Sequence, residues 1–216
     1  MSLKYLSKKP TKITENEKPP ALILLHGFGA DMNDLFGFTS YLDDRFFVAS
    51  VQAPFSLDFG GFAWFELYFE GGQVTGFNRK HFEQSLQLLD EFIDELIAEH
   101  DLDTDRIYIG GFSQGSMISV SSVFSKPETF AGAVLMSGRA SNEMIVEENI
   151  AKLKDFPFFV SHGTLDPVIP IEHGRATKEI LSRMPVELVY KEYVMAHEIS
   201  RETVIDLTVW LSSQLD

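Results

Sequence analysis

The chain has 216 residues and contains no cysteine, which excludes disulfide bonds, a thiolate nucleophile and a cysteine-ligated metal. It also lacks a long apolar run, since stretches such as residues 21–25 are far too short to span a membrane. Three lysines near the start, Lys4, Lys8 and Lys9, are not followed by the apolar segment of a signal peptide. We therefore expect a cytoplasmic protein without a stable membrane anchor.

Basic residues are scarce relative to acidic ones, with 18 lysines and arginines against 32 aspartates and glutamates, a formal charge of −14. This charge disfavours nucleic acids and anionic lipids as partners, because both are bound mainly through lysine and arginine. Hydrophobic residues at 44% and charged residues at 23% are typical of soluble globular proteins. The length fits a single domain over residues 1–216, in which residues 1–20 form a polar N-terminal segment.

Continuous apolar runs alternate with segments of helical periodicity, which indicates an α/β fold with a mostly parallel central sheet and helices on both faces. No large cap domain is expected. Strands are predicted at residues 21–25, 46–51, 106–110, 132–138, 156–162 and 187–193. Helices are predicted at residues 33–41, 80–100, 170–184 and 200–215. Residues 1–20 could add an edge strand, and residues 52–78 and 139–155 are predicted to be irregular.

The strand that starts at Arg106 runs into the sequence Gly-Phe-Ser-Gln-Gly at residues 111–115, and a helix with apolar positions follows. A G-x-S-x-G motif between a strand and a helix is typical of a nucleophile elbow. Glycine on both sides of Ser113 lets the strand and the helix approach closely, and the strained turn exposes the serine hydroxyl. The start of the helix would supply free N–H groups and a positive dipole end for an oxyanion.

A second glycine-rich turn, residues 26–31, follows the first buried strand. Hydrolases with a nucleophile elbow place their second oxyanion donor in such a loop. We assign the two donors to the backbone N–H groups of Phe28 and Gln114. His26 could serve as a catalytic base, but we expect its ring to brace this loop instead.

Asp166 and His197 each follow a predicted strand, and with Ser113 they give the chain order Ser, Asp, His. That order is typical of α/β-hydrolases. Serine needs an imidazole to take its proton, and the imidazole needs a carboxylate to fix its tautomer. His162 is a weaker candidate for the base and is expected to order the loop around Asp166. No His-Glu-x-x-His motif or comparable cluster is present, so neither a metal nor another cofactor is predicted.

Residues 52–78 are rich in aromatic residues and glycine, and long loops inside compact domains are often functional. The segment could line a site for an acyl chain, or its aromatic residues could pack the loop onto the body of the protein. A substrate-binding role is predicted for Trp64 and Phe65.

Taken together, these motifs resemble the phospholipase/carboxylesterase family of α/β-hydrolases, which includes the acyl-protein thioesterases. The resemblance is carried by residues 25–31, 52–54, 63–65, 105–107, 110–115, 162–170 and 196–199. It implies a serine esterase or thioesterase without a cofactor, with the catalytic roles on Ser113, Asp166 and His197. The chain departs from the family pattern at Ser116, at Ala196 before the histidine, and at Arg139-Ala140, where relatives commonly have Leu-Pro. Arg139 could bind an anionic group of the substrate, or it could be an ordinary surface arginine.

The sequence therefore predicts a carboxylesterase, lysophospholipase or acyl thioesterase that acts on a small-molecule ester or thioester through an acyl-Ser113 intermediate. One alternative is a peptidase or lactonase that uses the same triad, and another is a hydrolase-fold protein that binds without catalysis. The sequence does not determine the oligomeric state, and a homodimer is one possibility.

Overall fold

The computed structural model describes residues 3–13 and 17–216, so the first two residues of the predicted N-terminal segment and residues 14–16 lie outside the description. Its centre is a seven-stranded sheet in the order β1-β3-β2-β8-β9-β10-β11. Only β1 is antiparallel to its neighbour, and it forms the edge strand beside β3. The strands of the sheet are β1 (Tyr5–Lys8), β2 (Ala21–Leu25), β3 (Phe47–Val51), β8 (Ile107–Phe112), β9 (Gly132–Met136), β10 (Pro157–Gly163) and β11 (Glu187–Tyr193).

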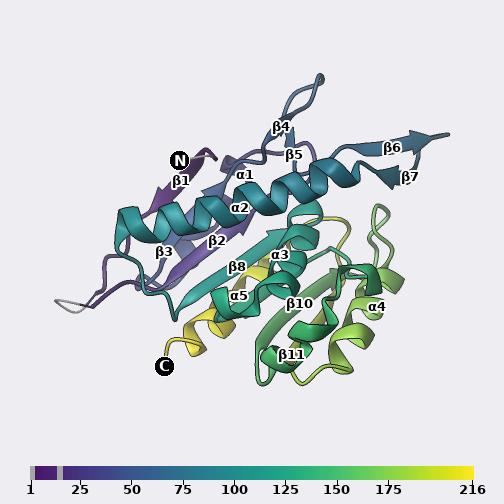
Figure 1. Cartoon of the computed structure of the whole chain (residues 1–216). Coiled ribbons are helices and arrows are strands. Elements are labelled where there is room, and N and C mark those ends of the chain that lie inside the picture. The colour runs from purple at the N-terminus through teal and green to yellow at the C-terminus, as the bar shows by residue number, and fades with distance from the viewer. Residues whose placement is uncertain (1–2, 14–16) are drawn as a thin grey trace.

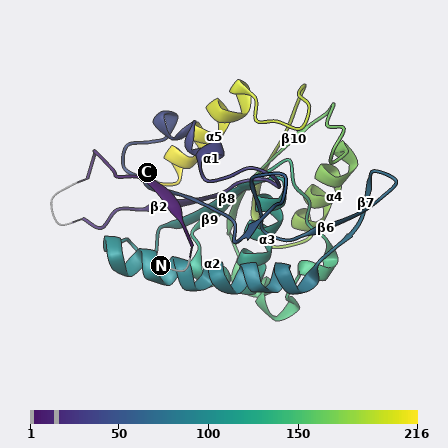
Figure 2. The same cartoon turned by 90° about the horizontal axis from the view of Figure 1, so that it is seen from above.

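Helices cover both faces of the sheet, as the sequence predicts (Figures 1 and 2). The helices are α1 (Asn33–Phe36), α2 (Arg79–His100), α3 (Gln114–Ser125), α4 (Ile171–Ser182) and α5 (Arg201–Ser213). In Figure 2, α2 and α3 lie on one side of the sheet and α1 and α5 lie on the other. The alternation along β2 matches this arrangement, because Ile23 packs into the core under α2 and α3 while Leu22 and Leu24 pack into the core with α1 and α5.

The ends of the longest helix are set by local signals. The side chain of Asn78 accepts a hydrogen bond from the His81 N–H and caps the start of α2. At the other end Asp101 adopts a left-handed conformation with φ 49°, which stops the helix before the chain turns into β8. The chain then enters β8, which lies between β2 and β9 at the middle of the sheet.

Three predicted segments differ from the structure. The helix predicted at residues 33–41 is divided at Gly37 into α1 and the short 3-10 helix η1 (Thr39–Tyr41). The segment 52–78, predicted to be irregular, folds into two small hairpins, β4 (Phe55–Ser56) with β5 (Phe62–Ala63) and β6 (Leu67–Glu70) with β7 (Gln73–Phe77). Figure 1 shows that the β6–β7 hairpin projects away from the body. The connection 139–155 contains the 3-10 helices η3 (Asn142–Met144) and η4 (Glu147–Leu153), after η2 (Pro127–Thr129).

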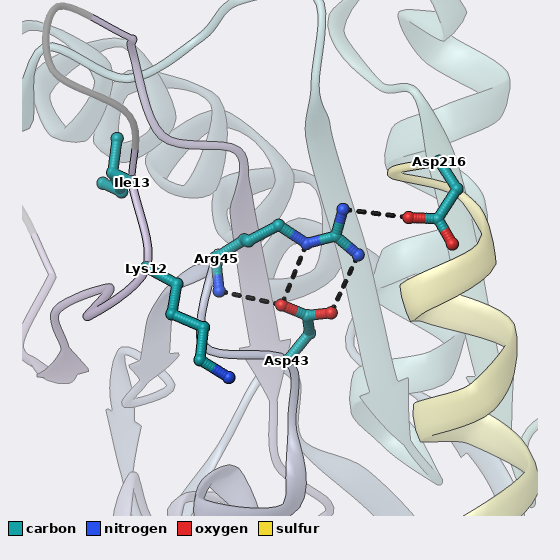
Figure 3. A pocket seen from close by; sticks show the side chains of 5 residues that line it. All are labelled: Lys12, Ile13, Asp43, Arg45 and Asp216. Atoms are coloured by element: carbon teal, nitrogen blue, oxygen red, sulfur yellow. Dashed lines mark hydrogen bonds and ion pairs between the residues drawn. The ribbon is translucent and has the colours of Figure 1, made fainter.

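Among the described residues no helix combines the length and the apolar character needed to cross a membrane. A hollow of about 530 Å³ opens beside the C-terminal residue and is lined by Lys12, Ile13, Asp43, Arg45 and Asp216 (Figure 3). Three of the lining residues, Asp43, Arg45 and Asp216, form ion pairs with one another. The Arg45 guanidinium donates to both carboxylate oxygens of Asp43, at 3.1 and 2.9 Å, and to Asp216 at 3.0 Å. These contacts join the end of the chain to the loop before β3.

The pairing with Arg45 makes a pH-dependent contribution to stability. The Arg45 hydrogen bonds lower the pKa of Asp43 from 3.8 to about 2. This contribution is therefore complete above pH 3.8 and is lost as the pH falls toward 2. Replacing Asp43→Asn should lower the free energy of unfolding at pH 7 by about 1 kcal/mol, since the pair is bidentate but near the surface.

Urea denaturation of the wild type and of Asp43→Asn between pH 7 and pH 2.5 measures this effect. The difference in unfolding free energy should shrink below pH 4. Replacing the exposed Asp58→Asn serves as the control and should change stability little. A difference for Asp43→Asn that stays constant across the pH range would contradict the assignment.

Candidate active site

Ser113 stands at a sharp turn between β8 and α3, at the middle of the sheet. Its backbone angles are φ 54° and ψ −113°, a conformation that is rare and strained for a residue with a side chain. The Ser113 N–H donates to the carbonyl oxygen of Met136 on β9 at 2.9 Å, which ties the turn to the neighbouring strand. The structure thus shows the strand, turn and helix that the G-x-S-x-G motif requires.

The two glycines of the motif are required by close backbone contacts. A Cβ atom on Gly111 would lie 2.2 Å from the carbonyl carbon of Gly115. A Cβ atom on Gly115 would lie 2.0 Å from the carbonyl oxygen of Leu25, at the end of β2. Backbone atoms cannot move aside as a flexible side chain can, so only glycine fits at either position.

The structure brings together the three residues that the sequence singles out as a triad. The Nε2 atom of His197 lies 2.9 Å from the hydroxyl oxygen of Ser113, and its Nδ1 atom lies 2.7 Å from Oδ2 of Asp166. With the proton on Nδ1, the imidazole donates to the carboxylate and accepts from the serine hydroxyl. This is the geometry of a nucleophile with its general base and the group that orients the base.

Asp166 is held in place by its own loop. Its other carboxylate oxygen, Oδ1, accepts hydrogen bonds from the N–H groups of Val168 and Ile169, at 2.8 and 2.9 Å. The buried His162 donates from Nε2 to the carbonyl oxygen of Ile169 at 2.7 Å and so fastens the same loop. This hydrogen bond agrees with the prediction that His162 orders the loop, and among the described residues none joins its ring to Ser113.

The loop that carries His197 packs directly against the loop that carries Asp166. The N–H of Leu165 donates to the carbonyl oxygen of Met195 at 3.1 Å. A Cβ atom on Gly163 would lie 2.4 Å from the carbonyl oxygen of Ala196, so glycine at 163 permits the contact. Ala196, a departure from the family pattern, is not among the described residues with positive φ, which explains why alanine is tolerated before His197.

The two assigned oxyanion donors lie on segments that meet at Ser113. A Cβ atom on Gly27 would lie 3.4 Å from the Cβ atom of Ser113, so the loop that contains Phe28 passes beside the serine. Gln114 is the first residue of α3. Within residues 3–13 and 17–216, the backbone N–H groups of Phe28 and Gln114 donate to no protein acceptor. Both donors are therefore available to a ligand oxygen.

The side chain of Gln114 has a structural role that the sequence did not reveal. Its Oε1 atom accepts from the N–H of Trp64 at 2.8 Å, and its Nε2 atom donates to the carbonyl oxygen of Phe65 at 2.6 Å. The Trp64 indole in turn donates to the carbonyl oxygen of His26 at 3.0 Å. One buried network thus links the elbow, the aromatic segment and the loop that carries Phe28. The feature of the sequence that indicates this network is the amide side chain of Gln114, directly after Ser113.

His26 braces its loop, as the sequence predicts. Its Nδ1 atom lies 2.7 Å from the carbonyl oxygen of Gly27, and its Nε2 atom accepts from the N–H of Ala53 at 3.0 Å. Burial lowers the pKa of His26 below its ordinary value of 6.5. The ring is therefore neutral at pH 7, with its proton on Nδ1, and the loop is locked to the segment after β3.

The substrate contacts predicted for Trp64 and Phe65 need correction, because both side chains are completely buried. They pack in the core below the site, and Trp64 forms the network with Gln114 and His26. Other aromatic residues of the same segment are exposed instead. Phe59 is 76% and Phe69 is 57% exposed, and their ring centroids lie 6.1 and 6.4 Å from the ring of Phe28.

The third predicted substrate contact, Arg139, lies next to the turn. Gly138 packs against the nucleophile, because a Cβ atom there would lie 2.3 Å from the hydroxyl oxygen of Ser116 and 3.1 Å from the carbonyl oxygen of Ser113. Arg139 follows directly and is partly buried. Across the described part of the chain, no cluster of three or more histidine, aspartate or glutamate side chains is arranged to hold a metal ion.

The chain is similar in sequence to known proteins. The family model described as Phospholipase/Carboxylesterase matches residues 9–215. The acyl-protein thioesterase 1 of Candida albicans is 30% identical over 212 residues, which covers 89% of this chain and 91% of that protein. The acyl-protein thioesterase 1 of Debaryomyces hansenii is 31% identical over 146 residues, or 66% of this chain and 63% of that protein.

Solved structures show the same fold. The crystal structure of the Bacillus cereus carboxylesterase superposes with a TM-score of 0.83 at 24% identity, and covers 98% of this chain and 94% of that one. The match of the family model to almost the entire chain, together with the thioesterase of Candida albicans, assigns the reaction class of a serine-dependent ester or thioester hydrolase. The chain belongs to the phospholipase/carboxylesterase family of α/β-hydrolases.

Proposed function

We propose that this protein cleaves carboxylic esters or thioesters through an acyl intermediate on Ser113, with His197 as the base and Asp166 as its orienting partner. The observation that carries the proposal is the continuous hydrogen-bonded series from the Ser113 hydroxyl through both nitrogens of His197 to Asp166. A free serine hydroxyl is a weak nucleophile, and this series supplies the base that activates it.

The geometry supports a two-step reaction. The Ser113 oxygen attacks the carbonyl carbon while His197 Nε2 takes the hydroxyl proton, and the N–H groups of Phe28 and Gln114 stabilise the oxyanion. Collapse of the tetrahedral intermediate expels the alcohol or thiol, which receives that proton from His197. A water molecule then attacks the acyl-serine, again with His197 as the base, and releases the acid and free Ser113.

We assign the exposed aromatic rings to the acyl group of the substrate, because an apolar acyl chain packs against such rings better than the other parts of the substrate do. Phe28 carries an oxyanion donor, and the rings of Phe59 and Phe69 adjoin its ring. Exposed apolar side chains that gather beside a reactive group mark a binding surface. The acyl chain therefore lies over the β2 side of Ser113, against Phe28, Phe59 and Phe69.

A binding protein without catalysis is the less favoured alternative. The strained backbone of Ser113 and the alignment of three catalytic side chains cost stability that binding alone does not require. The relatives named above are thioesterases and carboxylesterases, which supports catalysis.

Removal of the nucleophile tests the proposal. Ser113→Ala should lower kcat on a para-nitrophenyl ester series from acetyl to dodecanoyl by about 1,000-fold or more, because the acyl intermediate cannot form. Ser125→Ala, the same change at the exposed end of α3, is the matched control and should keep the wild-type rate. A wild type that is inert on the whole series, or equal activity in Ser113→Ala, would overturn the proposal.

A second pair of variants separates the exposed aromatic rings from the buried ones. Phe59→Ala and Phe69→Ala should lower kcat/KM for long acyl chains more than for acetyl, with a change in stability within about 0.5 kcal/mol, because both rings are exposed. Trp64→Phe should lower the unfolding free energy by about 1–3 kcal/mol, through the lost hydrogen bond and a small cavity. It should leave the chain-length preference unchanged. A shift of the chain-length optimum in Trp64→Phe, without such a shift in Phe59→Ala or Phe69→Ala, would instead support the substrate-binding role that the sequence predicts for Trp64.

A further inference from the structure

Among the residues that the structure describes, Arg139 has no ion-pair or hydrogen-bond partner for its side chain, which sets it apart from most arginines of this chain. Within the described residues, five other arginines form ion pairs with carboxylates, namely Arg45, Arg79, Arg106, Arg175 and Arg183. Arg139 forms neither an ion pair nor a side-chain hydrogen bond with any part of the chain that the structure describes, although it is partly buried. A guanidinium has five N–H donors, and partial burial removes some of the water that would satisfy them.

The backbone fixes Arg139 beside the reactive serine. On one side Gly138 packs against the carbonyl oxygen of Ser113. On the other side the N–H of Ala140 donates to the buried hydroxyl of Thr177 on α4 at 2.9 Å. The Arg139 backbone is therefore held between the elbow and α4, and only its long side chain is free to reach toward a substrate.

The order of the strands indicates which part of the substrate lies near Arg139. Phe28 follows β2, on one side of β8, whereas Arg139 follows β9, on the other side. Asp166 and His197 follow β10 and β11, farther along that second side. The leaving group must lie within hydrogen-bond reach of His197, because this imidazole protonates it. The leaving group therefore lies on the side of Arg139, opposite to the aromatic rings.

We infer that Arg139 binds an anionic group, a carboxylate or a phosphate, on the alcohol or thiol part of the substrate. The inference rests on the proposed ester or thioester hydrolysis at Ser113. A guanidinium matches either anion with two parallel hydrogen bonds. The chain as a whole carries a charge of −14 and repels anions, so their recognition needs a local cation at the site.

The test uses butyryl esters of three phenols that differ only at the para position: a carboxylate, a phosphate ester or a methyl ester. Arg139→Ala should lower kcat/KM for one or both anionic esters by about 10- to 100-fold and leave the neutral ester within about twofold. The carboxylate and phosphate arms show which anion the site prefers. Arg139→Glu should lower kcat/KM for the anionic esters further.

Ionic strength gives an independent readout. The preference of the wild type for an anionic ester over the neutral one should fall as salt rises, and this dependence should largely disappear in Arg139→Ala. Arg183→Ala removes the same charge at the distant end of α4 and is the matched control, with no expected change in selectivity.

Three outcomes would overturn the inference. The first is an equal effect of Arg139→Ala on all three esters. The second is an effect confined to esters whose anion is on the acyl side, such as the para-nitrophenyl ester of glutaric acid compared with that of pentanoic acid. The third is loss of selectivity in Arg201→Ala but not in Arg139→Ala, since Arg201 is the other arginine without a described ion pair. Absence of activity on every ester in the wild type would instead refute the proposed function.

Discussion

The close approach of the turn between β8 and α3 to the end of β2 determines the geometry of the site. Gly115 touches the carbonyl oxygen of Leu25, and Gly111 touches Gly115, at distances that leave no room for a Cβ atom. This contact forces Ser113 into its strained conformation and places the start of α3 beside the loop that follows β2. The proposed nucleophile and the two proposed oxyanion donors thus depend on two glycines, and the surrounding core supplies the stability that offsets the strain.

The polar groups around the turn form two rigid supports, one on each side of the sheet centre. On the β2 side, Gln114, Trp64 and His26 hold the loop of Phe28 through buried hydrogen bonds. On the β10 side, Asp166 and His162 hold the loops that orient His197. Preorganised donors of this kind need no rearrangement when charge develops in the transition state, and this is the main way in which enzymes stabilise an oxyanion.

The parts of the fold that could be predicted from the sequence are those that carry strong periodicity or fixed motifs. The strand at residues 187–193 and the long helix α2 were predicted nearly to the residue, because apolar spacing and capping residues define them locally. The triad residues meet, as expected for residues that follow the parallel strands β8, β10 and β11. The hairpins within residues 52–78 were missed, since their strands are only two to five residues long and the placement of the segment depends on distant residues, as the bridge between Ala30 and Phe62 shows. For the same reason the sequence could not distinguish the buried Trp64 from the exposed Phe59.

The proposed reaction requires that a covalent acyl group forms on Ser113 during turnover. Rapid quenching of the protein with a para-nitrophenyl ester, followed by mass spectrometry of the peptide that contains residues 107–125, measures this most directly. We expect a transient mass increase equal to one acyl group on Ser113, which is absent from Ser113→Ala and decays as the acid is released. Turnover without any acylated peptide, or an acyl group on another residue, would contradict it.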